Sequence, residues 1–206
     1  MTVKGSDIHI DFDGTSPQVD WGGNVVYNFT YAYVFMAIKS AFDPEIPINE
    51  GAIRPVKMTA PEGSVVNCKF PAAVAARMQI GHFMTEMVFK ALANAAPDNI
   101  IAESGGTPAQ TNIFYGRRHQ GRPWLTMIIR GGGLGASSRM DGHQCAIFPA
   151  NGANTPVEIF ESDTPLMVAE RSLVCDSGGP GKMRGGLGRK MVIRVPDDEY
   201  APQGPT

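Results

Sequence analysis

The chain has 206 residues, with 18 lysines and arginines against 20 aspartates and glutamates and a formal net charge of −2. Its basic pairs, Arg117-Arg118 and Arg189-Lys190, are too short to track a phosphate backbone, which excludes a typical nucleic-acid-binding protein. No apolar run reaches the ~18 residues of a membrane span, and the first residues, 1–6, lack an apolar signal region. We therefore expect a soluble, cytoplasmic protein that binds neither nucleic acid nor membrane.

Glycine and proline are abundant, with 24 and 16 residues spread along the whole chain. This share exceeds the usual composition and predicts a loop-rich fold. The three cysteines, Cys68, Cys145 and Cys175, are odd in number and far apart in apolar surroundings. We expect reduced, buried thiols, because neither a disulfide framework nor a CxxC metal site fits this spacing.

The N-terminal part begins with a strand over 7–12, where polar and apolar residues alternate. No second strand is evident nearby, so we expect this one to pair outside the chain or with a late segment. Residues 27–42 form an aromatic and aliphatic run of helical length that Asp43-Pro44 ends. The run is apolar nearly all round, which predicts a helix buried on both faces.

A strand over 53–60 follows, and a second helix is predicted over 72–95 from its helical apolar spacing. Gly81 interrupts that helix, and glycine costs about 1 kcal/mol relative to alanine in a helix interior. We therefore expect close packing at Gly81 or a helix break beside His82.

The sequence beyond 105–108 predicts a β-rich part. The overall prediction is a mixed, glycine-rich α+β fold, helix-rich over 1–104 and β-rich over 105–195, with a flexible polar tail over 196–206. The candidate strands are 111–115, 124–130, 144–148, 155–161, 167–175 and 190–195.

The stretch 176–188 contains six glycines between two apolar runs. Glycine loses much conformational freedom on folding, so such a run indicates positive φ angles or close backbone approach. Asp176 lies here with the cations Lys182, Arg184 and Arg189. Outward N–H groups beside cations can bind an anion, although composition alone favours a hairpin loop with a solvated basic rim. No Walker loop is present, because no Gly-Lys-Ser/Thr follows at the required spacing.

Asp141 and His143 flank Gly142 in a second glycine-rich region. They can act as a base and the group that orients it, or form an Asx-type turn with an exposed histidine. For His82 and His119 we expect packing and surface roles.

The remaining titratable residues indicate no site of their own. Glu158 and Glu161 lie three apart on a predicted strand, so they face opposite sides and form no dyad. No His, Asp or Glu pair has the close helical spacing of a metal site, and we expect no metal held wholly by this chain. Neither Gly-x-Ser-x-Gly nor a cysteine–histidine signature is present.

Five short motifs occur in a fixed order and together resemble the hydantoinase B/oxoprolinase family. The resemblance extends to about Val195 and covers the C-terminal portion of the longer B-type subunits of that family. The motifs are 11–18 (Asp-Phe-Asp-Gly-Thr-Ser-Pro-Gln), 61–64 with Asn67 and 71–74, 141–142, 156–158 with Glu161, and 176–181 with 184–186.

The resemblance implies one half of an ATP-dependent enzyme that opens hydantoins, 5-oxoproline or lactams; similar proteins are subunits of acetone and acetophenone carboxylases. An A-type partner would use ATP and Mg²⁺ to phosphorylate the substrate, and the B-type half would complete hydrolysis or carboxylation. The family's Asn-Asp-Pro and His-rich metal-binding segments have no counterpart here. We therefore expect no cofactor bound by this chain alone, a companion chain or segment that carries the divalent metal, and no activity without these partners.

The open alternative is a structural or assembly module of such a complex. If the chain contributes to catalysis, the loops around Asp141 and Asp176 are the expected contributors, while Asn67 orients substrate or braces the second helix. The expected catalytic residues are Asp176, Asp141 and His143, and the expected substrate-binding residues are Arg184, Asn67 and Ser177.

Overall fold

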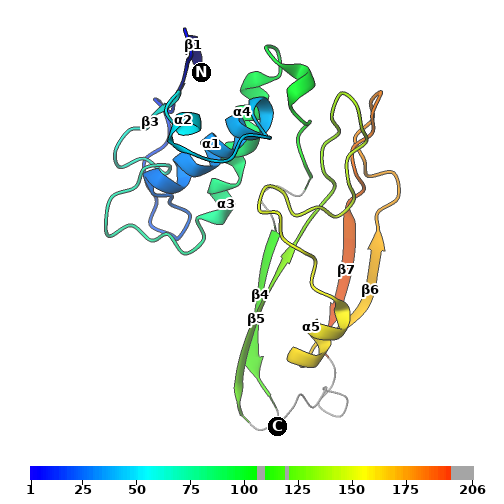
Figure 1. Ribbon diagram of the computed structural model, residues 1–206. Coiled ribbons are helices and arrows are strands. Elements are labelled where there is room, and N and C mark those ends of the chain that lie inside the picture. The colour runs from blue at the N-terminus through cyan, green and yellow to red at the C-terminus, as the bar shows by residue number, and fades with distance from the viewer. Residues whose placement is uncertain (106–109, 119–120, 196–206) are drawn as a thin grey trace. The chain divides into compact units, whose positions relative to one another are not determined.

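The computed structural model describes residues 1–105, 110–118 and 121–195 (Figure 1). The chain divides into two compact units. The N-terminal unit comprises Met1–Glu103 with Ser137–Arg139, and the C-terminal unit comprises the described residues of Ser104–Ala136 and Met140–Thr206. Helices and sheets are both present, which agrees with the predicted α+β class.

The N-terminal unit contains a three-stranded sheet in the order β1-β2-β3. Strands β1 (Thr2–Lys4) and β2 (Asp7–Asp11) are antiparallel, while β2 and β3 (Val56–Thr59) are parallel. The expectation that the first strand pairs outside the chain or late within it is therefore wrong. Its antiparallel neighbour is only three residues long, and Gly5, at a φ of +60°, makes the two-residue hairpin turn between them.

Helix α1 (Tyr27–Phe42) has the bounds that the sequence predicts. The hydroxyls of Tyr27 and Tyr31 donate hydrogen bonds to the carbonyls of Met58 and Val56, at 2.8 and 2.9 Å, and so fasten α1 to β3. One face is buried, but Asn28, Ala32 and Ser40 are exposed. The prediction of burial on both faces therefore holds only in part. Its buried residues are Thr30, Val34, Phe35, Ala37, Ile38 and Ala41.

The predicted second helix is shorter and broken. It comprises α3 (Met78–Gly81) and α4 (Phe83–Leu92), with His82 between them, as the glycine indicates. A Cβ at Gly81 would overlap the ring of Phe29, so glycine permits α1 to approach at this point. Helix α4 packs along α1, and its buried apolar residues, Met84, Val88, Phe89 and Leu92, extend the core of this unit. Short helices α2 (Glu50–Ile53) and η1 (Pro97–Asn99) complete it.

Buried His82 makes the stability of the N-terminal unit depend on pH. Its side chain is 1% exposed, its ring lies 5.4 Å from that of Tyr33, and burial lowers its pKa. Below pH ~6.5 the unfolded chain binds a proton that the folded chain resists, so stability falls as the pH decreases. We expect urea unfolding curves to show this loss between pH 7 and 5.

The matched variants are His82→Gln and His143→Gln. The first removes the buried imidazole, so the loss of stability in acid becomes smaller. The second removes an exposed imidazole, so the pH dependence remains as in the wild type. An unchanged pH dependence in a folded His82→Gln protein would contradict the assignment.

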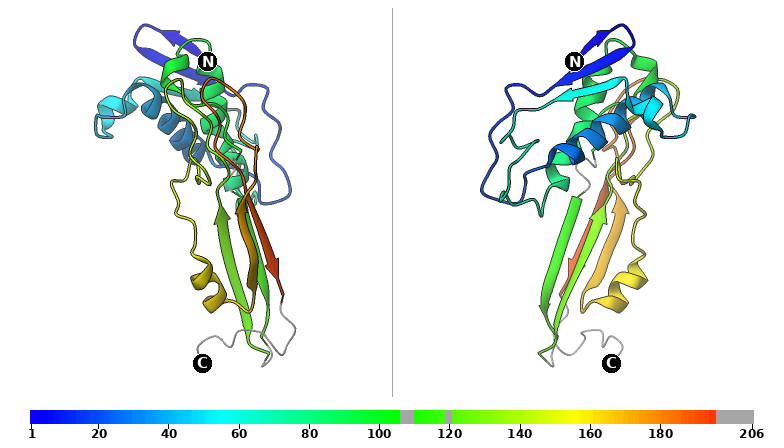
Figure 2. Two further views of the ribbon diagram at one scale, coloured as in Figure 1. Left: turned by 90° about the vertical axis from the view of Figure 1, so that its right-hand side faces the viewer. Right: turned by 60° about the vertical axis from the view of Figure 1, so that its left-hand side comes forward.

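The C-terminal unit contains two antiparallel hairpins (Figure 2). The first pairs β4 (Gln110–Arg117) with β5 (Pro123–Arg130), and the second pairs β6 (Met167–Leu173) with β7 (Arg189–Arg194). Buried Ile128, Phe160 and Leu166 form the core between them, with Phe114, Trp124, Val168, Met191 and Ile193 packed around it.

Two of the predicted strands are wrong. Residues 155–161 fall largely in a helix, α5 (Val157–Asp163), which begins after Pro156 and buries Phe160. Residues 144–148 form turns and isolated bridges, with Cys145 at a φ of +54°. Glu158 and Glu161 consequently share a helix side instead of opposing each other. Glu161 nevertheless accepts the backbone N–H of Val168 at 2.7 Å, which assigns it to fastening α5 to β6.

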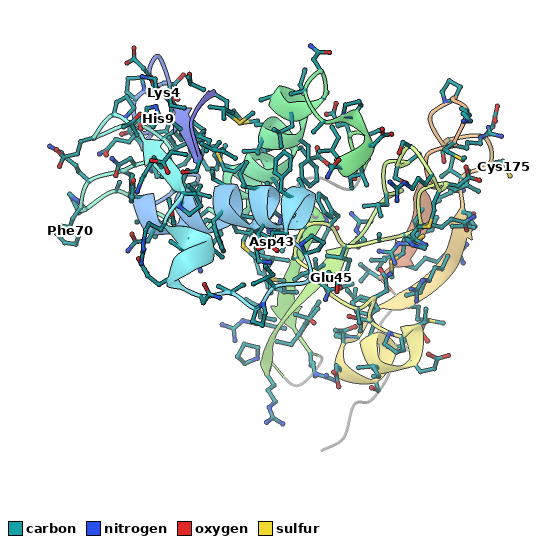
Figure 3. All side chains as sticks on the ribbon, turned by 45° about the horizontal axis from the view of Figure 1, so that its top comes forward. Lys4, His9, Asp43, Glu45, Phe70 and Cys175 are labelled. Atoms are coloured by element: carbon teal, nitrogen blue, oxygen red, sulfur yellow. The ribbon has the colours of Figure 1, made fainter. Side chains whose placement is uncertain are left out.

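None of the three cysteines is in a disulfide. Cys68 and Cys145 are half-buried, while Cys175, labelled in Figure 3, is exposed, so the expected burial fails there. In the described part of the chain, no helix is long and apolar enough to cross a membrane. The predicted tail, 196–206, lies outside the described residues, as does His119.

Candidate functional site

Three segments of the C-terminal unit lie side by side and form what we term the glycine cluster: residues 131–135, 141–143 and 176–188. The amide of Leu134 donates to the carbonyl of His143 at 2.8 Å, and the amide of Gly186 donates to the carbonyl of Leu134 at 2.9 Å. The amide of Gly142 donates to the carbonyl of Arg184 at 2.8 Å. Segments far apart in sequence are thus joined through their backbones.

Close approach explains the glycines of this cluster. A Cβ at Gly133 would overlap the carbonyl of Gly186, and one at Gly186 would overlap that of His143. A Cβ at Gly178 would overlap the carbonyl of Gly185. These three glycines lie outside the left-handed region. The residue that adopts a positive φ in this loop is Asp176, at +58°.

Arg184 brings two of the predicted catalytic residues together. Its guanidinium forms an ion pair with Oδ1 of Asp176, and its backbone N–H donates to Oδ1 of Asp141 at 2.7 Å. The side chains of Arg184 and Asp176 remain 53% and 86% exposed. Two carboxylates are therefore each fixed through one oxygen at a solvent-accessible edge of the cluster.

Ser177 closes the neck of the loop. Its hydroxyl donates to the carbonyl of Val174 at 2.7 Å and accepts the amide of Gly188 at 2.8 Å. Its donor and one of its acceptor sites are used within the chain, so the structure assigns it to positioning the loop. This geometry gives no support to the expected role in substrate binding.

His143 contributes its backbone to the cluster, while its side chain is exposed. Among the described residues, its ring makes no hydrogen bond with Asp141, so the structure provides no assembled base–orienter pair. Among the described residues, no nearby backbone N–H donates to the carboxylate of Asp141 as an Asx-type turn requires; its Oδ1 accepts the N–H of the distant Arg184. The exposed histidine of that alternative is present.

Asn67 belongs to the N-terminal unit, whereas the other five predicted site residues belong to the C-terminal unit. Its Nδ2 donates to the carbonyl of Ala60 at 2.9 Å, and its backbone bonds to Gly63 and Ser64. It therefore stabilises the 60–67 loop and not the second helix. Residues 16–18 pack against this loop: the amide of Gln18 donates to the carbonyl of Gly63 at 2.8 Å.

The motifs of the sequence thus meet in pairs. Residues 16–18 of the first motif pair with 63–65 of the second in the N-terminal unit, and 141–142 pair with 184–186 in the C-terminal unit. Sequence reasoning missed that 131–135 supplies the central segment of the glycine cluster. Its triple glycine, Gly131-Gly132-Gly133, was the available signal, because it matches the glycines of the segments it contacts.

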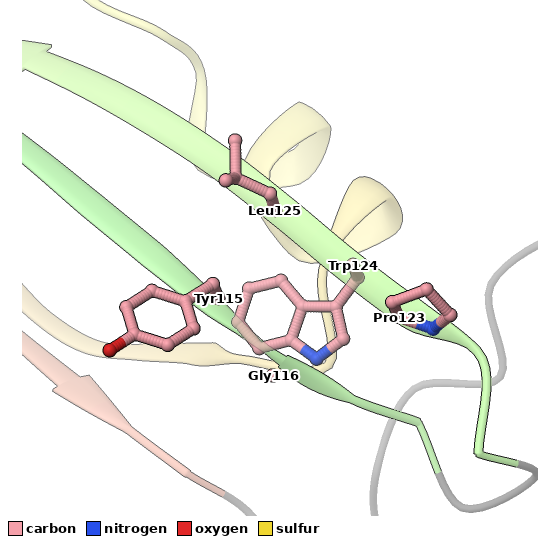
Figure 4. Close-up of a pocket in the computed structure, with 5 residues that line it drawn as sticks. All are labelled: Tyr115, Gly116, Pro123, Trp124 and Leu125. Atoms are coloured by element: carbon pink, nitrogen blue, oxygen red, sulfur yellow. The ribbon is translucent and has the colours of Figure 1, made fainter.

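Two further features of the described residues bear on metal binding and on pockets. Within the described residues, no three His, Cys, Asp or Glu side chains gather as a metal site requires. A shallow hollow on the first hairpin is lined by Tyr115, Gly116, Pro123, Trp124 and Leu125 (Figure 4). Its lining is mainly apolar, and Tyr115 supplies its one titratable side chain.

The profile of the family described as hydantoinase B/oxoprolinase matches residues 1–201, and the chain belongs to that family. The chain is similar to the putative B-type subunit of a D-/L-hydantoinase of Pseudomonas sp. (strain NS671), with 34% identity over 99% of this chain and 37% of that protein.

Two solved structures share the fold. The ATP-dependent caprolactamase from Pseudomonas jessenii matches with a TM-score of 0.78 and 25% identity, over 92% of this chain and 34% of that one. An acetone carboxylase in its nucleotide-free form matches with a TM-score of 0.79 and 21% identity, over 91% of this chain and 26% of that one. The chain thus spans about a third of the length of the hydantoinase and caprolactamase relatives.

Proposed function

We propose that the chain is part of the B-type subunit of an ATP-dependent enzyme that opens cyclic amides. The observation that carries this proposal is the 34% identity to the putative B-type hydantoinase protein over nearly the whole chain. The substrate would be a hydantoin, 5-oxoproline or a lactam, phosphorylated with an A-type partner that supplies ATP and Mg²⁺. Ketone carboxylation is the second candidate, because the acetone carboxylase shares the fold.

The glycine cluster supports a direct contribution to that reaction. The second carboxylate oxygens, Oδ2 of Asp176 and Oδ2 of Asp141, are not used by Arg184. Each can accept a proton or a hydrogen bond from a substrate amide or an attacking water. Arg184 meanwhile restricts both carboxylates to one orientation, which reduces the entropy lost when substrate binds.

The described residues do not fit a metal ion held by this chain alone, because they provide no three-ligand group. As the family resemblance implies, we place the divalent metal of the complete enzyme on a companion chain or segment. An exposed apolar strip on β4 and β5 supports assembly with such a partner. The strip consists of Ile113, Tyr115, Leu125 and Met127, which are 55–78% exposed.

The test begins with native mass spectrometry of the chain purified from its own host. A complex with an A-type protein and a companion chain is expected, and this complex should open hydantoin, 5-oxoproline or caprolactam only when ATP is present. The chain alone should show no turnover. Bicarbonate-dependent turnover of acetone would favour the carboxylase. A stable complex inactive on every one of these substrates would favour the assembly module.

A further inference from the structure

Three arginines lie near one another in the C-terminal unit: Arg130 at the end of β5, Arg171 in β6 and Arg189 at the start of β7. Nη1 of Arg189 donates to Oδ1 of Asn154 at 2.6 Å, and Nη1 of Arg171 donates to the carbonyl of Thr155 at 3.2 Å. Because Asn154 and Thr155 are consecutive, these bonds bring the two guanidinium groups to the same place.

Arg130 ends the first hairpin beside the segment that carries Asn154. The next residue, Gly131, lies against the backbone of Cys145 and Ala146. Nδ2 of Asn154 donates to the carbonyl of Cys145 at 2.9 Å, which joins this backbone to the partner of Arg189. Burial lowers the pKa of Arg189, and the neighbouring charges of Arg171 and Arg130 lower it further, while Cys145 opposes them.

Among the described residues, no acidic side chain forms an ion pair with Arg130, Arg171 or Arg189. The ion pairs in the described part of the chain are Lys39–Asp43, Lys69–Glu62, Arg184–Asp176 and Lys190–Glu170, and none of them involves this group. In addition, Nε of Arg130 is buried and has no hydrogen-bond partner among the described residues. Like charges in a partly buried place, with an unsatisfied donor, destabilise the folded state unless an anion neutralises them.

We propose that Arg130, Arg171 and Arg189 form a binding site for a phosphate-class oxyanion. Guanidinium groups present paired N–H donors that match tetrahedral oxyanions. A phosphate carries more than one negative charge at neutral pH, so it neutralises three cations better than a single carboxylate does. The oxyanion is either free inorganic phosphate or the phosphoryl group of a small molecule. The proposal does not rest on the reaction proposed above.

The test is titration calorimetry of the folded chain with inorganic phosphate at constant ionic strength, with acetate and chloride as comparison anions. The wild type is expected to bind phosphate at least tenfold more tightly than acetate. Arg171→Gln should weaken phosphate binding at least tenfold, because Arg171 is exposed and its loss spares the bond of Arg189 to Asn154. Arg130→Gln is the second variant, and Arg194→Gln is the control.

Arg194 lies at the opposite end of β7, opposite Met167, and is also exposed. Its variant should bind phosphate within twofold of the wild type. Acetyl phosphate distinguishes the two possible ligands. If it binds more tightly than inorganic phosphate, the ligand is a phosphorylated small molecule; if it binds more weakly, the ligand is the free ion. Phosphate binding that is absent, matched by acetate, or weakened equally by Arg194→Gln and Arg171→Gln would overturn the proposal.

Discussion

We expect Gly178→Ala to lower the free energy of unfolding of the C-terminal unit by about 3 kcal/mol, the upper range for overpacking a close-packed site. The added Cβ would overlap the carbonyl oxygen of Gly185, which is a backbone atom and cannot rotate away as a side chain can. The hydrogen bond between the amide of Gly185 and the carbonyl of Gly179, at 3.0 Å, holds the two sides of the loop together. Urea unfolding followed by circular dichroism measures the loss.

Gly179→Ala is the matched control, one residue away in the same loop. Nothing lies within 4 Å of a Cβ added at Gly179, and its φ lies outside the left-handed region. Alanine at such a position restricts the unfolded chain, so we expect stability to be unchanged or raised by up to about 1 kcal/mol. Equal destabilisation by the two variants would mean that close backbone approach is not the reason for these glycines.

Asp176→Asn in the assembled complex is expected to lower turnover about 100-fold, the lower range for losing a general acid or base. The amide retains the shape of the carboxylate but cannot accept a proton. Asparagine also tolerates the positive φ of this position, which alanine does not. Asp176→Asn therefore isolates the chemistry of the side chain from backbone strain. The measurements are the rate of ATP-dependent ring opening and the mass of the complex.

Glu170→Gln provides the comparison for Asp176→Asn. Glu170 also pairs with a cation, Lys190, at 2.8 Å, but it lies on the paired strands outside the glycine cluster. Its variant should keep turnover within twofold of the wild type. Loss of the complex with normal turnover in what remains assembled would assign Asp176 to assembly and not to the reaction.

Elements with a strong local pattern could be predicted from the sequence. Helix α1 has one continuous apolar pattern and an Asp-Pro stop, so its bounds were confirmed. The first hairpin of the C-terminal unit follows runs of β-branched and aromatic residues. The second follows apolar residues interrupted by charged ones, and its strands also lie where the sequence predicts them. The strand predicted over 155–161 was wrong because a short amphipathic segment fits either a helix or a strand. Burial of Phe160 against the two hairpins favours the helix.

The sequence indicated which segments of the candidate site are rich in glycine, but not which hydrogen bonds join their residues. The dense glycines of 176–188 indicated close approach, and the structure confirms this for Gly178 and Gly186. That Arg184 would join Asp141 to Asp176 could not be predicted, because the bond to Asp141 comes from a backbone amide. Side-chain type carries no information about such a bond. The roles proposed for Asp176, Asp141 and His143 in catalysis stay predictions.

The exposed apolar strip on the first hairpin makes self-association of the chain depend on its concentration. Tyr115 and Leu125 lie opposite each other, at 78% and 72% exposure, on a hairpin of only two strands. Paired strands with an uncovered apolar face and open edges adhere to copies of themselves. Encounters between copies increase with the square of the concentration, whereas folding of one molecule does not. We therefore expect self-association of the chain by itself to increase with its concentration, and a partner that covered the strip would oppose this self-association.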